Sequence, residues 1–379
     1  MKRLYFDYSA SAPRSLGLSS FLASLDSFKN PSSVHQEGQQ ARAFLETTRR
    51  DLKQLLGAKP QDKLIFTSGG TEANNLVFSS LLCHEVVGKK VIISAVEHAA
   101  ILTLVPLLEE KGLIPVFLPV SEKGQIDLDY YASLLDEDVG LVSVMLVNNE
   151  TGFIFPIKEM ARMARDKNIR FHTDAIQAIG KMPFNFHELG VDYASWSAHK
   201  FGGLTGVGGL LIRDGIDIIP QILGGPQEDS KRAGTENMWG VASAGYALKA
   251  VYKSFDDEFQ RQQKLRDDFI KALKKKIPLC VVIESDQNVP SILSLAFPKM
   301  DGKIIATNLD LEGVAVSFGS ACSSGAVNKS HVISVLGLND DLAHGVIRIS
   351  FGLLTTKDDF DRLLEIITVV MQRMSGEGS

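Results

Sequence analysis

Short, almost continuously apolar runs alternate with amphipathic stretches from the N-terminus to about residue 250. Such runs fit strands buried on both faces, and the stretches between them fit the helices that cover those strands. Strands are predicted at residues 64–67, 91–94, 116–118, 141–147, 169–173 and 209–212. Helices are predicted at residues 36–56, 71–82, 99–110 and 156–167. The pattern predicts an α/β fold in which a mainly parallel sheet is covered by helices.

The rhythm changes after about residue 240. A long polar helix is predicted there, followed by short strands, a glycine-rich segment around Cys322 and a final helix; these elements are placed at residues 241–276, 280–283, 291–296 and 357–373. A chain of 379 residues is long enough for two domains. We therefore predict a large domain at residues 15–254, and a smaller α+β domain made of residues 1–14 and 255–379, which carries the Cys322 loop.

The charge pattern excludes several classes of partner. The net charge of -5 comes from mixed signs without a dense basic run, so no nucleic-acid partner is expected. No apolar run approaches the roughly 18 residues of a membrane span, and no membrane partner is expected. The N-terminus reaches Asp7 before any secretory apolar stretch forms, which predicts a cytoplasmic protein.

Only three cysteines occur, Cys83, Cys280 and Cys322. An odd and sparse set argues against a disulfide framework and for a reducing compartment. No C-x-x-C pair or His/Cys cluster is present, so no metal site is predicted. Any cysteine chemistry must therefore belong to a single thiol.

Three motifs carry chemistry, each with an ordinary structural alternative. Ser68 to Thr71 follow an apolar run and open a helix, which suits an anion site or a common strand-to-helix turn. Asp174 ends a strand and fits either the partner of a protonated ring nitrogen or a helix cap.

The third motif is Lys200, which lies among small, apolar and hydroxylated residues and is followed by glycines. A desolvated lysine of this kind suits Schiff-base chemistry, whereas most single lysines only reach solvent. Ser197 and His199 lie close enough in sequence to bind a phosphate from the same turn. The ordered set of glycine-hydroxyl loop, strand-end acid and enclosed lysine favours the chemical interpretation.

Nine sequence blocks in this order carry a family resemblance over nearly the whole chain. They are YFDYSA at 5–10, NPSSVH at 30–35, FTSGGTEANN at 66–75, EH at 97–98, NNETG at 148–152, DAIQ at 174–177, SAHK at 197–200, RAGTEN at 232–237 and GSAC at 319–322. The chain resembles the cysteine desulfurases of iron-sulfur cluster assembly, which are class V aminotransferase-like enzymes of fold type I. The resemblance implies pyridoxal 5'-phosphate as cofactor and L-cysteine as substrate.

The resemblance also implies roles for individual residues. Lys200 holds the cofactor covalently, Asp174 pairs with the pyridine nitrogen, and Gln177 bonds the ring hydroxyl. His98 stacks on the ring and acts as an acid and base. The phosphate-binding residues are Gly70, Thr71, Ser197, His199 and, from a second subunit of a homodimer, Thr235. Asn149 and Arg348 hold the substrate carboxylate, although a surface salt bridge is the simpler interpretation of the arginine alone.

Cys322 separates desulfurase chemistry from that of other relatives. Glycines and small hydroxylated residues dominate residues 317–326, which predicts an exposed loop and therefore a candidate nucleophile. Cys280 instead resembles a strand-core residue, and Cys83 ends an apolar helix. The resemblance implies that Cys322 receives sulfur as a persulfide and passes it to a scaffold protein or another acceptor.

The sequence departs from the family pattern in places. The run GGPQEDS at 224–230 carries Pro226 and Asp229 where relatives have a third glycine and a base, and Leu353 stands where many have arginine. These changes leave the cofactor residues whole but bear on rate, substrate preference and partner choice. Alternatives that stay open are a selenocysteine lyase, a transaminase or kynureninase-type enzyme, and a weakly catalytic sulfur-delivery partner. The sequence leaves the identity of the acceptor open.

Overall fold

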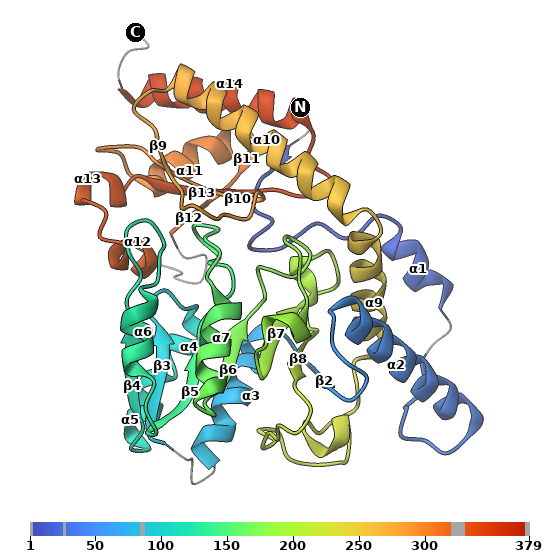
Figure 1. Cartoon of the computed structure of the whole chain (residues 1–379). Helices are drawn as coiled ribbons and strands as arrows, with labels where there is room; N and C mark the ends of the chain where they lie inside the picture. Colours follow the sequence, from blue (N-terminus) through green and yellow to red (C-terminus); the bar gives the residue numbers. More distant parts are fainter. Residues whose placement is uncertain (1–2, 26–27, 84–87, 320–329, 376–379) are drawn as a thin grey trace.

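The computed structural model describes residues 3–25, 28–83, 88–319 and 330–375 (Figure 1). Its central sheet has seven strands, in the order β2 (Lys63–Thr67), β8 (Gly208–Ile212), β7 (Tyr193–Ser197), β6 (Arg170–Asp174), β5 (Val139–Ser143), β3 (Lys90–Ser94) and β4 (Ile114–Leu118). Strand β8 is antiparallel to both of its neighbours, and all other neighbouring pairs are parallel. The predicted α/β fold class is confirmed.

Strand β7 was not among the predicted strands. Its sequence, Tyr-Ala-Ser-Trp-Ser, is short and carries hydroxyls, yet every residue in it is buried. The Ser195 hydroxyl lies 3.0 Å from Nε2 of His172 on β6, whose Nδ1 lies 2.8 Å from the Ser143 hydroxyl on β5. Hydrogen bonds between polar side chains on three neighbouring strands therefore allow these residues to be buried, and for this reason β7 lacks a continuous apolar run.

Of the six predicted helices, four have nearly the predicted bounds and two differ. The observed helices are α1 (Leu18–Ser24), α2 (Gln36–Leu55), α3 (Gly70–Cys83), α4 (Ala99–Leu102), α5 (Val105–Glu110), α6 (Leu128–Leu134), α7 (Ile157–Asp166), α8 (Phe186–Leu189), α9 (Met238–Tyr252), α10 (Phe255–Lys276), α11 (Gly302–Leu311), α12 (His331–Val335), α13 (Asp340–Ala343) and α14 (Lys357–Ser375), with short 3₁₀ turns η1 (Ala198–Lys200) and η2 (Glu228–Ser230). The helix predicted at 99–110 breaks because Pro106 opens α5 and cannot donate a backbone hydrogen bond. The helix predicted at 241–276 is two helices, separated by Lys253 and Ser254.

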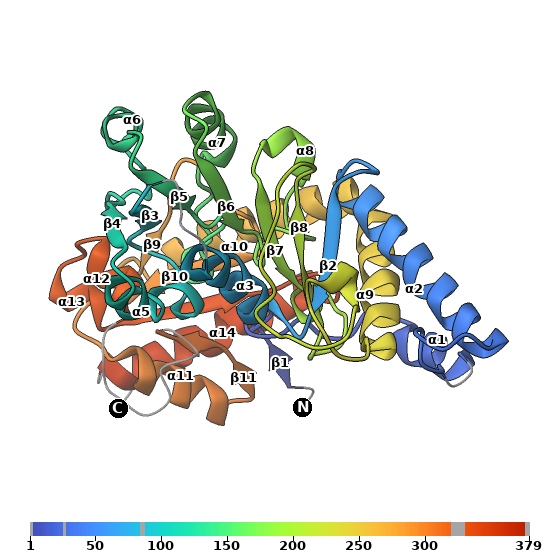
Figure 2. The ribbon, with the colours of Figure 1, turned by 90° about the horizontal axis from the view of Figure 1, so that it is seen from below.

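Helices cover both faces of the central sheet (Figure 2). The apolar residues of α2, α6, α7, α8 and α9 pack on one face, and those of α3, α4 and α5 pack on the other. Because both faces are covered, the strands can be almost wholly apolar. Among the described residues, no helix is both long enough and apolar enough to span a membrane.

A second sheet is antiparallel and lies above the first in Figure 1. Its strand order is β12 (Ser317–Phe318), β13 (Val346–Ser350), β10 (Ile292–Ala296) and β9 (Val281–Ile283). Its apolar face packs with α10, α11 and α14 and with Leu4 and Phe6 of the N-terminal segment, in which β1 (Leu4–Tyr5) pairs in parallel with β11 (Val314–Ala315). This separate cluster is consistent with the predicted boundary near residue 255. However, Ile292 and Val346 pack into the large cluster, so the boundary stays a prediction.

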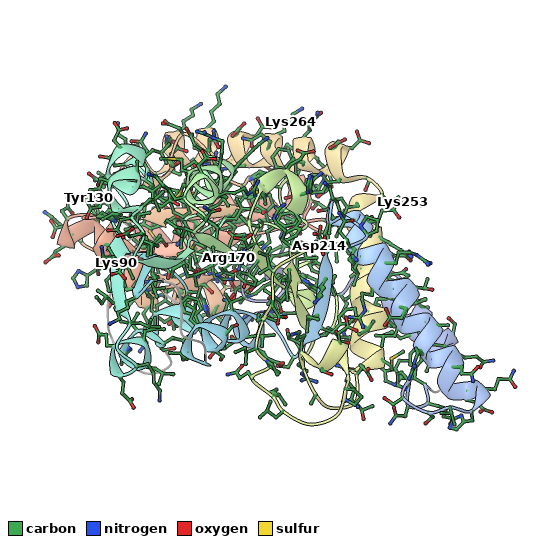
Figure 3. The ribbon with its side chains drawn as sticks, turned by 60° about the horizontal axis from the view of Figure 1, so that its bottom comes forward. Lys90, Tyr130, Arg170, Asp214, Lys253 and Lys264 are labelled. Atoms are coloured by element: carbon green, nitrogen blue, oxygen red, sulfur yellow. The ribbon has the colours of Figure 1, made fainter. Side chains whose placement is uncertain are left out.

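The two edges of the central sheet differ in character. Figure 3 looks toward the edge at which Lys90 and Arg170 begin β3 and β6 and Asp214 follows β8. The opposite edge, which faces the second sheet in Figure 1, holds the carboxyl ends of β2, β3, β6 and β7. Ligand-binding groups of open α/β sheets lie at this carboxyl edge.

The loop at residues 224–230, where the sequence departs from the family pattern, is held in place by the buried side chain of Glu228. Glu228, Asp229 and Ser230 all have positive φ, between 49° and 62°, which costs energy in residues other than glycine. The side chain of Glu228 is only 2% exposed and accepts two hydrogen bonds from Arg49, at 2.6 and 3.0 Å. It also accepts one from the backbone N–H of Phe66 at 2.8 Å. The ion pair therefore ties the strained loop to α2, and the hydrogen bond from Phe66 ties it to β2.

Replacing Arg49 with methionine is expected to lower the free energy of unfolding by about 3–5 kcal/mol, because the buried Glu228 carboxylate loses its counter-charge. Urea unfolding measures the change. Arg373→Met is the matched control, since the Arg373–Glu312 pair is 58% and 39% exposed and such pairs contribute at most about 1 kcal/mol. Equal losses in the two variants would contradict the anchoring role of Arg49.

Candidate functional site

A cavity of about 350 Å³ opens at the carboxyl edge of the central sheet. Its lining includes every predicted site residue other than Thr235 and Cys322: Gly70, Thr71, His98, Asn149, Asp174, Gln177, Ser197, His199, Lys200 and Arg348. These residues come from distant parts of the chain, and the parallel strands bring them to one edge. The fold thus assembles one site from six of the nine sequence blocks.

Lys200 ends the 3₁₀ turn η1, directly after β7. Its Nζ donates to the backbone carbonyls of Ser9 at 2.6 Å and Ala10 at 2.9 Å. The side chain is therefore directed to the cavity and the N-terminal segment rather than to bulk solvent, which removes the ordinary surface-lysine alternative.

Asp174 ends β6 and is only 5% exposed. One carboxylate oxygen accepts from the Asn74 amide at 2.8 Å, and the other accepts from the backbone N–H of Ile176 at 2.9 Å. Burial raises the pKa of this carboxyl group above its ordinary value, opposed by the Asn74 hydrogen bond. The backbone contact resembles the cap that the sequence allowed, but a turn and not a helix follows Asp174.

The start of α3 and the turn after β7 line one end of the cavity. Gly70 begins α3, and a Cβ there would lie 2.0 Å from the end of the Ile176 side chain, which would have to move. The Ser197 hydroxyl lies 2.9 Å from Nδ1 of His199. Burial, and then the nearby lysines, lower the pKa of His199 to about 4, so its ring is neutral at pH 7. Hydroxyls and helix-start amides suit a phosphate.

His98 caps α4 and contributes to the cavity wall. Its Nδ1 accepts a hydrogen bond from the backbone N–H of Ala100 at 3.0 Å. Burial is the main cause that lowers the pKa of His98 below its ordinary value. In the neutral ring the proton therefore lies on Nε2, because Nδ1 already accepts.

Arg348 lies in the middle of β13, with its side chain 4% exposed. It donates to the Asn149 carbonyl at 2.8 Å, to the Asp7 carboxylate at 2.9 Å and to the Ser317 hydroxyl at 3.0 Å. The salt bridge that the sequence left as an alternative thus exists, but it is buried. Nε of Arg348 has no hydrogen-bond partner among the described residues.

The structure adds residues that sequence reasoning missed. Glu150 and His331 also line the cavity. Nε2 of His331 lies 2.9 Å from the backbone carbonyl of Glu97, and the Ser330 hydroxyl donates to the Glu150 carboxylate at the base of the same wall. Glu97 and Glu150 lie inside two of the quoted blocks, which was a usable signal. No periodicity marked His331, which begins a five-residue helix.

Two predicted residues are not placed in the cavity. Thr235 is exposed and lies outside the lining residues, so its role from a second subunit stays a prediction. Cys322 lies outside the described residues. Cys280 is buried, 4% exposed, as the sequence predicted, and burial raises the pKa of its thiol to about 12. Within the described ranges, no group of His, Cys, Asp and Glu side chains is arranged to hold a metal ion.

Comparison with known proteins shows the family of the chain. The family model described as aminotransferase class-V matches residues 4–363. The chain belongs to the class-V aminotransferase family. It is 42% identical to the cysteine desulfurase IscS of Dictyoglomus turgidum, over 99% of this chain and 96% of that protein. It is 39% identical to the cysteine desulfurase NifS of Azotobacter vinelandii, over 92% and 87%.

Solved structures of the same family match the fold as well. A NifS-like protein superimposes with a TM-score of 0.91 at 32% identity, over 98% of this chain and 99% of that one. A NifS-like protein from Rickettsia africae gives 0.89 at 29% identity, over 98% and 99%. The predicted family resemblance and the predicted fold type are confirmed.

Glu97 gives a pH-dependent prediction. Its carboxyl group is fully buried, one of its oxygens has no partner among the described residues, and burial raises its pKa to about 8. Between about pH 4.5 and 8 the unfolded chain loses this proton while the folded chain keeps it, so Glu97 destabilises the fold as the pH rises.

The Glu97→Gln variant has no carboxyl group to ionise at this position. As the pH rises through this window, the free energy of unfolding of the unaltered chain should therefore fall relative to that of the variant, by up to about 1.4 kcal/mol per pH unit. Urea unfolding from pH 5 to 8 measures the difference, and the exposed Glu110→Gln is the control. A difference that does not change with pH would show that Glu97 is ionised in the folded protein.

Cys280 is expected to resist alkylation in the folded protein. At pH 8, a thiol with a pKa of about 12 has roughly 1000-fold less thiolate than one with a pKa of about 9. Iodoacetamide labelling followed by mass spectrometry should modify Cys280 only after unfolding. Labelling of Cys280 at similar rates before and after unfolding would contradict its burial.

Proposed function

We propose that this chain is a cysteine desulfurase that converts L-cysteine to L-alanine and transfers the sulfur to Cys322 as a persulfide. The observation that carries the proposal is the meeting of Lys200, Asp174 and Arg348 in one cavity. A Schiff-base lysine, an acid for a ring nitrogen and a carboxylate-binding arginine are what an amino-acid enzyme with a pyridoxal cofactor needs.

Pyridoxal 5'-phosphate fits the donor set. Gly70, Thr71, Ser197 and His199 provide an anion-binding end, and the tight contact at Gly70 keeps the backbone close to it. We assign the lysine link to Lys200, the pyridine nitrogen to Asp174 and the ring hydroxyl to Gln177. When bound, the cofactor supplies an electron sink for the bond-breaking steps.

The protein groups would handle the substrate as follows. Asn149 and Arg348 bind the substrate carboxylate, and the Asp7 contact fixes the plane of the guanidinium. The Lys200 amine takes the α-proton and holds it at Nζ. His98, neutral at the cavity wall, offers its Nε2 proton to the substrate and takes it back. Both proton transfers would take place in a cavity that Ser9 and Ala10 of the N-terminal segment also line.

Sulfur transfer is assigned to Cys322. Its thiolate attacks the substrate sulfur, a new S–S bond forms, and the substrate C–S bond breaks. The electron pair of that bond goes to the substrate carbon, which takes a proton and becomes the methyl group of alanine. Cys280 is unsuited to this step because its thiol is buried and has a raised pKa.

Further parts of the proposal follow from the family. The protein would act as a cytoplasmic homodimer in which Thr235 of each subunit contributes to the phosphate site of the other. Residues 15–254 would form the cofactor-binding domain, and residues 1–14 and 255–379 would form the domain that carries Cys322. An iron-sulfur scaffold or another sulfur acceptor would receive the persulfide.

The test is turnover of L-cysteine by the purified protein. Without added reductant we expect alanine and a mass increase of one sulfur on the peptide that contains residue 322; an added thiol should reduce this persulfide, release sulfide and become a disulfide. Cys322→Ala should keep the absorbance of the bound cofactor but lower desulfurase turnover by more than about 100-fold, since the nucleophile is lost. Cys280→Ala is the matched control and should stay within about two-fold of the unaltered enzyme. Full turnover by Cys322→Ala would refute the sulfur-transfer assignment.

A further inference from the structure

A second buried lysine lies next to the catalytic cavity. Lys181 follows β6 by seven positions and is only 8% exposed. It lines a smaller neighbouring cavity of about 70 Å³, together with Phe255 and Phe351, and is absent from the lining of the catalytic cavity. Lys200 lines both cavities. Lys181 therefore lies behind the catalytic wall and does not reach the substrate space itself.

Lys181 contacts the catalytic wall through Gln177. Its Nζ donates to the side-chain carbonyl oxygen of Gln177. On the other side, the Gln177 amide nitrogen donates to the backbone carbonyl of Ser9 at 3.0 Å. The same carbonyl accepts from Lys200 at 2.6 Å. A continuous chain of hydrogen bonds thus connects the two lysines.

The two ends of this chain decide the orientation of the Gln177 amide. A backbone carbonyl can only accept, so the amide nitrogen must face Ser9. The amine of Lys181 donates, so the amide oxygen faces away from that carbonyl. Without Lys181, the buried oxygen would lose its donor, and rotation of the amide would be less costly.

We propose that Lys181 is a positioning residue for the reaction, which holds the Gln177 amide so that its nitrogen is presented as a donor to the ring hydroxyl of the cofactor. The inference rests on the proposed function, because it assumes that pyridoxal 5'-phosphate occupies the catalytic cavity. It adds a residue that touches neither cofactor nor substrate and acts only through Gln177.

The electrostatics agree with this role. Burial is the main cause that lowers the pKa of Lys181 well below its ordinary value, and the nearby Lys200 and Arg348 lower it further. The amine donates to the Gln177 oxygen in either protonation state, and the lowered pKa weakens the positive charge that it places beside Lys200. The position therefore suits a hydrogen-bond donor more than a counter-charge.

The test is a double-mutant cycle on cofactor binding by the apoprotein. Lys181→Met removes the donor at similar volume, Gln177→Leu removes the amide, and the double variant combines them. Lys274→Met, at a lysine that is 53% exposed, is the matched control. The readouts are the dissociation constant for pyridoxal 5'-phosphate and the absorption spectrum of the bound form, neither of which needs turnover.

We expect Lys181→Met to weaken binding by about five-fold, the factor that one neutral hydrogen bond contributes, and to shift the absorption band in the same direction as Gln177→Leu. The double variant should equal Gln177→Leu alone, because Lys181 acts through that residue. Should Lys181→Met not fold, Lys181→Ala removes the same donor and completes the cycle.

Two results would overturn the inference alone. One is a Lys181→Met protein that binds and absorbs like the unaltered protein while Gln177→Leu does not. The other is a double variant whose loss is the product of the two single losses, since the residues would then act independently. An unaltered apoprotein that does not bind pyridoxal 5'-phosphate would instead refute the proposed function, and this inference with it.

Discussion

The parallel pairing of β6 with β7 is the constraint on which the site depends. Asp174 pairs with Ser195 in this register, so the strand-end carboxylate and the turn that carries Lys200 reach the same edge of the sheet. A shift by one residue would turn Asp174 to the opposite face. The Ser143–His172–Ser195 contacts across three strands hold this register with polar groups, in a layer that is otherwise apolar.

The N-terminal segment closes the site from the other side. The carbonyl of Ser9 accepts hydrogen bonds from both Lys200 and Gln177, and the Asp7 carboxylate accepts one from Arg348. Asp7 and Ser9 of the N-terminal segment thus connect the central sheet with β13, which lies more than 300 positions away from them in sequence. These contacts hold Arg348 and Lys200, the proposed substrate-binding and cofactor-binding residues, at the same cavity.

The departure at residues 224–230 lies outside the catalytic cavity, whereas Leu353 lines the smaller neighbouring cavity together with Lys200. In the 224–230 loop, Glu228 keeps a buried ion pair with Arg49, while Glu228, Asp229 and Ser230 adopt left-handed backbone conformations. The loop is therefore anchored at its base even though its outer residues differ. Gln227 of this loop accepts a hydrogen bond from the backbone N–H of Gly234, next to Thr235, so in the proposed homodimer the loop would lie near the second subunit.

Much of the fold could be predicted from the sequence because short apolar runs mark most of the buried strands. Five of the seven central strands coincide closely with apolar runs, and a sixth, β5, begins two residues before its run and ends four residues early. Strand β7 was not predicted because the buried hydroxyl of Ser195 has its partner, His172, on another strand, which local periodicity does not show. The break at Pro106 was legible in the sequence, whereas the division between α9 and α10 lacked a proline or glycine to mark it.

The sequence by itself determined which chemical groups the chain carries and their order: a glycine-hydroxyl loop, a strand-end acid, an enclosed lysine and a cysteine in a glycine-rich stretch. Only the tertiary structure decided which groups meet. It brought His331 and Glu150 to the cavity, buried Arg348 against Asp7, and placed Lys181 behind Gln177. The physical reason is that local patterns report burial and backbone preference, whereas hydrogen bonds between residues distant in sequence arise only when the strands and the N-terminal segment have packed.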